Sequence, residues 1–575
     1  MMKKAILLGA SLVFLLTGLS AQSLDDARKA IDEEQYARAK GILENLVQKQ
    51  PKKGDNYFYL GQIYLKNDYL DSAKLVFEQG RAADSKNLLN TAGLGIVELF
   101  SGNQAGAETL FSEINSKIKK KNYLELYHIG RAYIDAPEPD YGKAMQYLNQ
   151  ALSRTGKKQD PLIHLALGDA YFGTDQRSPA YSSYRDAITL NPDLTRAEVQ
   201  MAVIMRGSRA WNEAIGSLEE IIAKKPNYAP TYRELAETYN AWAFFATDTN
   251  VYKERNDTAV KYYKQYMDLT DYSVESRIRY ADFLVFARDY DELLKQAHEL
   301  SQFEDINPKI LRYLGHASYH KKDYNEAESA LTRMLSRMEA ERVIARDYLY
   351  LGLSKLKNAI QTATTDVAGF DSGISYIRKA VEVDATSADD LNITGRELLA
   401  ANKFLESAKV FEISSGTEGS RNQVTDTYYF GLAAYFANAN LINKGEPRSD
   451  ELIDKADAAF VYVIDKAPDL LDPYLYRARN MSLKEDSENF QGYATAHYEK
   501  YIEMVKSKGD EEIQKSKANL IEIYNTMAYQ YVLIENFTKA KELLSETIKL
   551  EPGNEYAQQV LAYIEQMIAY NAAGR

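Results

Sequence analysis

The sequence predicts an all-α solenoid of about 14 antiparallel helix pairs. The main observation is a pattern that recurs after 34 positions, so that Gly168 and Tyr184 correspond to Ala202 and Leu218. A fixed period in this range is typical of stacked repeats rather than of one globular core. Within each period small residues alternate with larger apolar ones, as two closely packed helices require. A proline such as Pro192 ends the unit.

Residues 161–192 carry the pattern of a known family. Seven residues match the small, apolar and proline positions of the tetratricopeptide repeat: Leu167, Gly168, Tyr171, Ala180, Tyr184, Ala187 and Pro192. The chain therefore resembles the tetratricopeptide repeat family. The resemblance implies two antiparallel helices, A and B, in each repeat, a right-handed superhelix, and a concave groove lined by helix A.

The first 21 residues are expected to be a secretory signal peptide. Lys3 and Lys4 precede an apolar run at 5–19, and Ala21 offers a small residue for cleavage before Gln22. The alternative is an uncleaved anchor, although the run is short for a membrane span. No later stretch is apolar enough to span a bilayer. We therefore expect a periplasmic protein, either free or peripheral to the outer membrane, with an Ala21–Gln22 junction similar to that of exported Bacteroidota proteins.

Composition narrows the function classes. The chain has 575 residues, a formal charge of −12 and no cysteine. The absence of cysteine excludes disulfides, thiol catalysis and a lipid-anchored cysteine. An acidic surface repels phosphate backbones, so nucleic acid is not an expected partner. Most of the 44 tyrosines fall on packing positions, which predicts a structural role between helices.

The repeats fall into three predicted blocks after the signal peptide at 1–21. The first block, 22–228, holds repeats at 24–51, 54–87, 88–121, 123–157, 161–192 and 195–226. The central block, 229–509, has insertions between helix A and helix B of four repeats. The last block, 510–575, holds one regular repeat and a helix at about 555–570 that covers the end of the stack, as solenoids require.

The four insertions are predicted at 243–256, 358–371, 438–451 and 482–493. Each follows a helix A pattern and precedes the matching helix B pattern, so all four should emerge on one edge of the stack. Repeat proteins often use such an edge for binding. The alternative is that the insertions extend helix A and pack on a neighbour, as Trp242, Phe244 and Phe245 suggest.

An aromatic residue recurs just before the small residue of helix B. We predict that these rings plug the gap where the two helices of a pair diverge. The residues are Tyr36, Tyr141, Trp211, Tyr290, Tyr324, Phe404 and Phe537.

Signatures of chemistry are weak. His316 and His320 lie four residues apart, a spacing that puts both rings on one face of a helix and suits zinc. A third ligand and a His-Glu-x-x-His motif are both missing, so an ordinary polar groove face is the preferred interpretation. The sequence contains no nucleophile elbow, phosphate loop or dinucleotide fingerprint. We expect no enzyme activity, no metal and no cofactor.

The resemblance also implies which residues face the groove. Positions of helix A that line it in the family correspond here to Arg196, Arg206, Arg233, Asn240, Arg312, His316, Tyr319 and Arg346. This locally basic groove is expected to hold an acidic or extended peptide segment. The alternative is that the charges only solvate the groove.

These observations favour a scaffold or adaptor that binds protein partners. Export and the habits of the family point to cell-envelope or outer-membrane complexes, in assembly, transport or secretion. The alternative function is binding of glycan or peptidoglycan by the tyrosine-rich groove or the insertions.

Overall fold

The computed structural model describes residues 22–270, 272–305, 307–361, 365–486 and 490–573. These residues form 30 α-helices and no strand, and 78% of the chain is helical, which confirms the predicted fold class. The predicted signal peptide at 1–21 lies outside the described residues. Within them, no helix combines the length and the apolar character that crossing a membrane requires.

Contacts divide the chain into two compact units, the first ending at Tyr313 and the second beginning at Leu314. The first unit contains α1 (Leu24–Asp32), α2 (Tyr36–Lys49), α3 (Gly54–Lys66), α4 (Leu70–Ala83), α5 (Leu89–Phe100), α6 (Gln104–Lys117), α7 (Leu124–Asp135), α8 (Tyr141–Thr155), α9 (Pro161–Gly173), α10 (Arg177–Leu190), α11 (Thr195–Gly207), α12 (Trp211–Lys224), α13 (Ala229–Ala243), α14 (Thr249–Leu269), α15 (Val274–Ala287) and α16 (Tyr290–Leu300).

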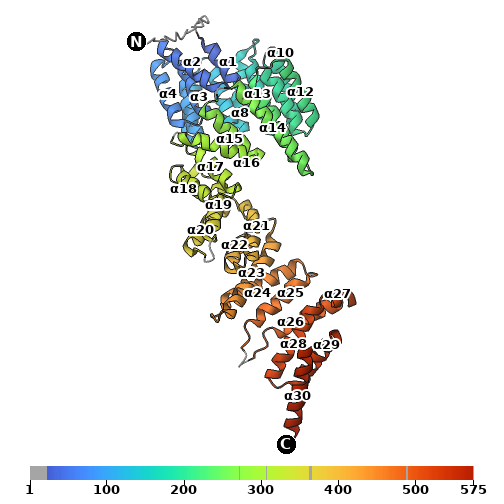
Figure 1. The fold of residues 1–575 in the computed structure, drawn as a ribbon. Helices are drawn as coiled ribbons and strands as arrows, with labels where there is room; N and C mark the ends of the chain where they lie inside the picture. The colour runs from blue at the N-terminus through green and yellow to red at the C-terminus, as the bar shows by residue number, and fades with distance from the viewer. Residues whose placement is uncertain (1–21, 271, 306, 362–364, 487–489, 574–575) are drawn as a thin grey trace, which may run out of the picture. The chain divides into compact units, whose positions relative to one another are not determined.

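The helix α17 (Lys309–His320) spans the division. The second unit contains α18 (Tyr324–Leu335), α19 (Ala345–Ala359), α20 (Val367–Val383), α21 (Leu391–Ala400), α22 (Phe404–Ser415), α23 (Gln423–Asn443), α24 (Asp450–Lys466), α25 (Leu471–Ser482), α26 (Thr495–Ser507), α27 (Asp510–Lys515), α28 (Lys517–Leu533), α29 (Phe537–Leu550) and α30 (Glu555–Ala573). Among the described residues, all helices except α27 and α30 form 14 consecutive pairs, and α30 follows the last pair as the predicted end helix (Figure 1). The predicted block boundaries at 228 and 509 stay predictions.

Helix A and helix B of a pair approach closely where a glycine of A faces a large side chain of B. A Cβ atom at Gly168 in α9 would overlap the ring of Tyr184 in α10, which is fully buried. Gly61 and Phe77 repeat the arrangement in α3 and α4. The small residue of the repeat is therefore a steric requirement of the pair.

The turn from helix A to helix B also repeats. In nine of the 14 pairs that the structure describes, the residue two positions before helix B has a positive φ, for example 59° at Glu34, 65° at Asp68 and 60° at Arg209. The following amide then donates back to helix A, as Gln35 does to the Ala30 carbonyl at 2.8 Å. This is the Schellman motif, which ends a helix with one left-handed residue. It reverses the chain within three residues and sets up the antiparallel pair.

Each predicted aromatic plug is the first residue of its helix B. Some rings also reach the next pair. Trp211 lies 5.6 Å from Phe245 and Phe404 lies 5.4 Å from Phe436, measured between ring centroids. These rings therefore pack between successive pairs as well as between the two helices of one pair.

All four insertions lie between a helix A and its helix B, and two of them mainly lengthen a helix of their pair. The insertion at 358–371 includes the end of α19 and the start of α20. The first 21-residue helix, α14, starts inside 243–256, so this insertion extends helix B. The other 21-residue helix, α23, runs into the insertion at 438–451, so this insertion extends helix A. The insertion at 482–493 instead forms the connection between α25 and α26. Residues 362–364 and 487–489 lie outside the described residues.

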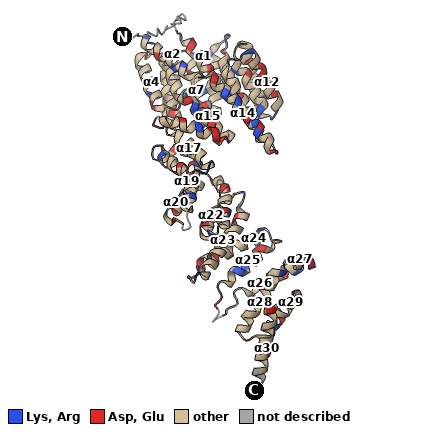
Figure 2. Cartoon of the chain, viewed as in Figure 1, with Lys and Arg blue, Asp and Glu red and all other residues tan. Residues whose placement is uncertain are grey.

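Charged residues of both signs are mixed along the helices of each unit (Figure 2). Many of them form ion pairs on the surface between neighbouring helices, such as Lys143 with Glu108 at 2.6 Å. Such exposed pairs contribute little to stability, so the pairs of helices are held mainly by their apolar faces.

The close approach predicts opposite effects for two Gly→Ala changes. Gly168→Ala should destabilise α9 and α10 by about 1–3 kcal/mol, because the added methyl overpacks against Tyr184. Gly216→Ala in α12, where nothing lies within 4 Å of the added Cβ, should stabilise the protein by about 0.5–1 kcal/mol. Circular dichroism during urea unfolding would measure both. Equal effects of the two changes would contradict the steric interpretation.

Candidate functional site

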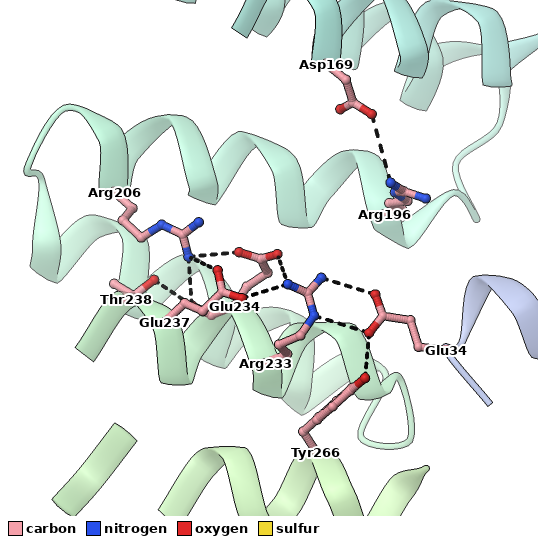
Figure 3. A network of polar contacts seen from close by, with 9 residues as sticks. All are labelled: Glu34, Asp169, Arg196, Arg206, Arg233, Glu234, Glu237, Thr238 and Tyr266. Carbon is pink, nitrogen blue, oxygen red and sulfur yellow. Dashed lines mark hydrogen bonds and ion pairs between the residues drawn. The ribbon is translucent and has the colours of Figure 1, made fainter. Parts of the chain in front are cut away.

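The first unit closes on itself. Glu34, in the turn between α1 and α2, accepts two hydrogen bonds from Arg233 of α13, at 3.2 Å from Nε and 3.1 Å from Nη2. The hydroxyl of Tyr266 in α14 donates to the same carboxylate at 2.9 Å. Figure 3 shows this two-pronged contact, and Figure 1 shows the blue N-terminal hairpins beside the green helices α13 to α15. A planar guanidinium matches a carboxylate in this geometry, which makes the contact directional.

A second layer of charges supports the contact. Nη1 of Arg233 lies 2.9 Å from Glu234 and 2.8 Å from Glu237. Nη1 of Arg206 lies 2.8 Å and 3.2 Å from the same two carboxylates (Figure 3). Two arginines therefore share three carboxylates. Burying a charge is unfavourable unless it is paired, so each member of this network depends on the others.

The network shifts the pKa values of its carboxyl groups in different directions. Burial opposes ionisation of Glu34, but the charge of Arg233 and the hydrogen bonds from Arg233 and Tyr266 outweigh it and lower its pKa. The pKa of Glu237 is raised, by burial and by the neighbouring charge of Glu234. Glu34 therefore stays ionised at neutral pH, and the closing contact has its full charge there.

Three further contacts line the same seam. The Tyr69 hydroxyl donates to Glu275 at 3.2 Å, and Gln35 donates to the carbonyl of Leu269 at 3.3 Å. Arg279 donates to Asn67 at 3.3 Å and lies 4.9 Å from the centre of the Tyr36 ring. We call these contacts, together with the Glu34 network, the closing seam. It joins α1 to α4 with α13 to α15.

The closing seam borders a cavity of about 380 Å³ on the concave side of the first unit. Its wall comes from α1, α3, α7, α9, α11 and α13, with Tyr36 from the start of α2. All but Tyr36 belong to A helices or to the turn after α1, as the resemblance implied for the concave face. A second, more open cavity of about 620 Å³ shares Glu34, Tyr36 and Arg233 with the first.

One wall of the smaller cavity is aromatic. Tyr59, Tyr127 and His128 line it, and the His128 ring lies 4.6 Å from the buried ring of Phe58. Burial, followed by the nearby charge of Arg28, lowers the pKa of His128 to about 3, so the imidazole is neutral. Its Nε2 atom is buried and has no hydrogen-bond partner in the described part of the chain. The wall thus offers ring faces and one unused polar nitrogen.

Another part of the wall carries paired charges. Arg131 binds Asp135 through Nη2 at 2.7 Å and also forms an ion pair with Asp169. Burial raises the pKa of Asp135, but the charges of Arg131 and Lys66 outweigh it, so its pKa is lowered overall. Arg196 lies 4.0 Å from Asp169, a loose pair that leaves its side chain 39% exposed. Arg196 therefore retains capacity to bind a ligand, as do the more exposed Arg28 and Lys66 of the same cavity.

The eight predicted groove residues are divided between the two cavities and positions on α17 and α19. Arg196 and Arg233 line the smaller cavity, while Arg206, Arg233 and Asn240 line the larger one. Asn240 donates to Asn256 of α14 at 2.8 Å. In the second unit His316 and Tyr319 lie in a cluster with Tyr350, while Arg346 is exposed on α19. Arg312 is half-buried on α17.

The histidine pair does not converge on one point. His316 is buried, with Nε2 3.0 Å from Asp347, and the Nε2 of His320 lies 3.0 Å from the Tyr350 hydroxyl. The two ring nitrogens are thus directed to different partners. Within the described ranges, no group of three or more histidine, aspartate or glutamate side chains is arranged to hold a metal ion.

The sequence analysis missed the residues that close the first unit. Glu34, Tyr266 and Arg279 are up to about 245 residues apart, so no local pattern links them. The sequence gives only a weak indication that Glu34 lies in a turn. It occupies the left-handed turn position at which aspartate, glycine and asparagine also occur in this chain. That signal accounts for the turn and not for the pairing with Arg233.

Comparisons with known proteins give partial similarities. No protein-family model matches the chain. It is 22% identical over 139 residues to Tetratricopeptide repeat protein 1 of Schizosaccharomyces pombe, a match that spans 24% of this chain and 13% of that protein. Together with the 34-residue period of its own hairpins, this supports the resemblance to the tetratricopeptide repeat family.

Solved structures are similar over parts of the chain. One is the C-terminal part of a TPR repeat-containing protein from Cytophaga hutchinsonii, with 24% identity, 49% of this chain and 98% of that chain covered, and a TM-score of 0.31. Another is pilF of Pseudomonas aeruginosa, with 18% identity, 40% and 98% covered, and a TM-score of 0.27.

The closing seam predicts a large effect of one neutral substitution. Glu34→Gln removes the charge that Arg233 and Tyr266 bind, while the side chains of Glu34 and Arg233 are only 19% and 25% exposed. Hydrogen bonds to charged groups contribute about 1.5–3 kcal/mol. Amides of α1 and α2 should therefore exchange about ten- to hundredfold faster. Lys253→Gln, which breaks an exposed pair with Asp257, is the control and should change exchange less than about fivefold. Equal exchange rates in both variants would contradict the seam.

The seam should also open in acid. Because the pKa of Glu34 is lowered by folding, its stabilising contribution is present above the ordinary pKa of 4.5 and is lost as the pH falls through the lowered value. The chain has no cysteine, so spin labels attach only to cysteines that are introduced. Labels at Asp71→Cys on α4 and Lys261→Cys on α14 report the distance between these two helices across the seam. That distance should be narrowly distributed at pH 7 and broaden as the pH falls below 4.5 through the lowered pKa of Glu34. A distribution that stays narrow until the whole protein unfolds in acid would exclude Glu34 as the closing group.

Proposed function

We propose that this protein is an exported periplasmic adaptor that binds protein partners in cell-envelope or outer-membrane complexes. The setting includes complex assembly, transport and secretion. The solenoid fold supports a protein-interaction scaffold, because stacked helix pairs create extended binding surfaces. The N-terminal sequence supports export, since a basic start, an apolar run and Ala21 precede Gln22.

One observation carries the proposal: the concave side of the first unit forms a lined cavity of about 380 Å³. This volume lies in the range of binding pockets, which combine apolar and aromatic walls with a few placed polar groups. The cavity has tyrosine rings, the neutral His128 and the loosely paired Arg196. We propose that it receives a short segment of the partner, with Arg196 binding an acidic group.

Site-specific crosslinking tests this proposal. Replacing Tyr127, which lines the cavity, with a photoreactive phenylalanine analogue should give protein adducts in living cells. The same replacement at Tyr181, an exposed residue of α10 away from the cavity, is the control and should give at least fivefold less adduct. Adding Arg196→Gln should reduce the Tyr127 adducts at least threefold. The adducts should be found in the periplasmic fraction, on a chain that begins at Gln22.

Other outcomes would overturn the proposal. Equal adducts from Tyr127 and Tyr181 would exclude the cavity as the binding site. A chain that stays in the cytoplasm with its first 21 residues attached would exclude export. Glycan fragments crosslinked at Tyr127 in place of protein would favour the alternative of glycan binding, for which the ring faces of Tyr36, Tyr59 and Tyr127 would provide stacking surfaces.

A further inference from the structure

Three successive A-to-B turns of the first unit carry exposed arginines and phenylalanines. Arg209 lies in the turn between α11 and α12, and Arg288 in the turn between α15 and α16. Phe244 and Phe245 lie in the turn between α13 and α14, and Arg255 lies in the second helical turn of α14. We call these five residues the arginine–phenylalanine edge. It lies outside both cavities and outside the closing seam.

The two phenylalanine rings are exposed but fixed in place. Phe244 is 50% exposed and Phe245 is 52% exposed. Phe245 packs against Trp211 at 5.6 Å, and Phe244 meets the Tyr252 ring edge-on at 6.3 Å. Adjacent large apolar side chains that remain exposed are a feature of binding sites, and their fixed orientation lowers the entropy lost when a partner binds.

The arginines stack on aromatic rings. The guanidinium carbon of Arg209 lies 4.4 Å from the Phe245 centroid, and that of Arg288 lies 5.7 Å from the Phe244 centroid. Arg255 lies 3.8 Å from the Trp242 ring and donates to the Trp242 carbonyl at 3.1 Å. A guanidinium held over a ring in this way still has N–H groups able to donate to a partner.

None of these three arginines has a carboxylate within ion-pair distance in the part of the chain that the structure describes. Arg131, Arg206 and Arg233 in the same unit, by contrast, each bind at least two carboxylates. The nearby Asp248 and Asp289 accept backbone amides as caps of α14 and α16. The arginines of the edge therefore have N–H groups that can donate to a carboxylate of a partner, since no carboxylate of the described chain forms an ion pair with them.

We propose that the arginine–phenylalanine edge docks a protein partner through an acidic segment whose carboxylates flank an apolar or aromatic side chain. The apolar side chain packs on Phe244 and Phe245, and the carboxylates bind the edges of Arg209 and Arg288. Arginine and aromatic residues dominate the binding energy of protein interfaces, and bidentate carboxylate contacts add direction. An anionic membrane is disfavoured, because the chain has a charge of −12 and α14 also carries the exposed Glu254 and Asp257. The edge is a second site beyond the adaptor cavity and does not depend on it.

Selection from a displayed library of seven-residue peptides tests the edge on the full chain. The unmodified protein should enrich peptides with aspartate or glutamate on both sides of a phenylalanine, tryptophan or leucine. Arg209→Glu/Arg288→Glu should bind these peptides at least tenfold more weakly, and Phe244→Ala/Phe245→Ala should do the same. The control is Arg81→Glu/Arg185→Glu, a reversal of two exposed arginines elsewhere in the unit, which should change binding less than twofold.

Further measurements distinguish docking at the edge from a loss of folding and from membrane binding. Melting followed by circular dichroism should stay within a few degrees for both arginine variants, because exposed arginines contribute little to stability. Enriched peptides without the acidic–apolar pattern, or equal binding by all variants, would overturn the proposal. Binding of phosphatidylglycerol vesicles that is lost in Arg209→Glu/Arg288→Glu, without peptide binding, would also overturn it in favour of a membrane surface. The outcome of this peptide selection does not depend on the Tyr127 crosslinking experiment, so a failure of the cavity proposal would leave the docking proposal standing.

Discussion

The structure depends on the close approach of two helices within each pair. A glycine or alanine on helix A lets a large ring of helix B pack directly against the backbone, as Gly168 and Tyr184 do. The left-handed residue in the turn then fixes how sharply the chain reverses. Because both features recur, each pair adds a similar rotation to the stack, and small rotations accumulate into a curved array. After seven pairs the curve brings Glu34 to Arg233.

The fold could be predicted because its determinants are local. The 34-residue period, the small residues and the aromatic at the start of helix B all lie within one repeat, and the structure has 14 pairs among its described residues. The sequence also indicated where the insertions lie and how long they are, but not whether they form loops or extend helices. Apolar residues such as Val251 and Tyr252 fit a loop or a longer helix equally well, and in the structure they belong to α14.

The candidate site was only partly predictable, for a physical reason. Helix A positions indicated that Arg196, Arg206, Arg233 and Asn240 face the concave side, and these residues do line the two cavities. Their ion-pair partners could not be inferred, because the meeting of Glu34 with Arg233 depends on the summed rotation of all intervening pairs. A small error in each rotation would separate the two groups by far more than hydrogen-bond distance. In the structure Arg206 and Arg233, expected as free basic groups of the groove, are thus paired with carboxylates.

The closing seam has a consequence for how strongly the concave side can bind. A ligand that fits within the smaller cavity meets a prearranged site, whereas a longer chain that has to cross the seam binds only molecules in which the seam is open. If only a fraction of molecules is open, the apparent dissociation constant rises by the inverse of that fraction. The same contact that gives the first unit its shape thus acts as a filter by size, and a mutation of Glu34, which itself lines both cavities, would widen what the smaller cavity accepts.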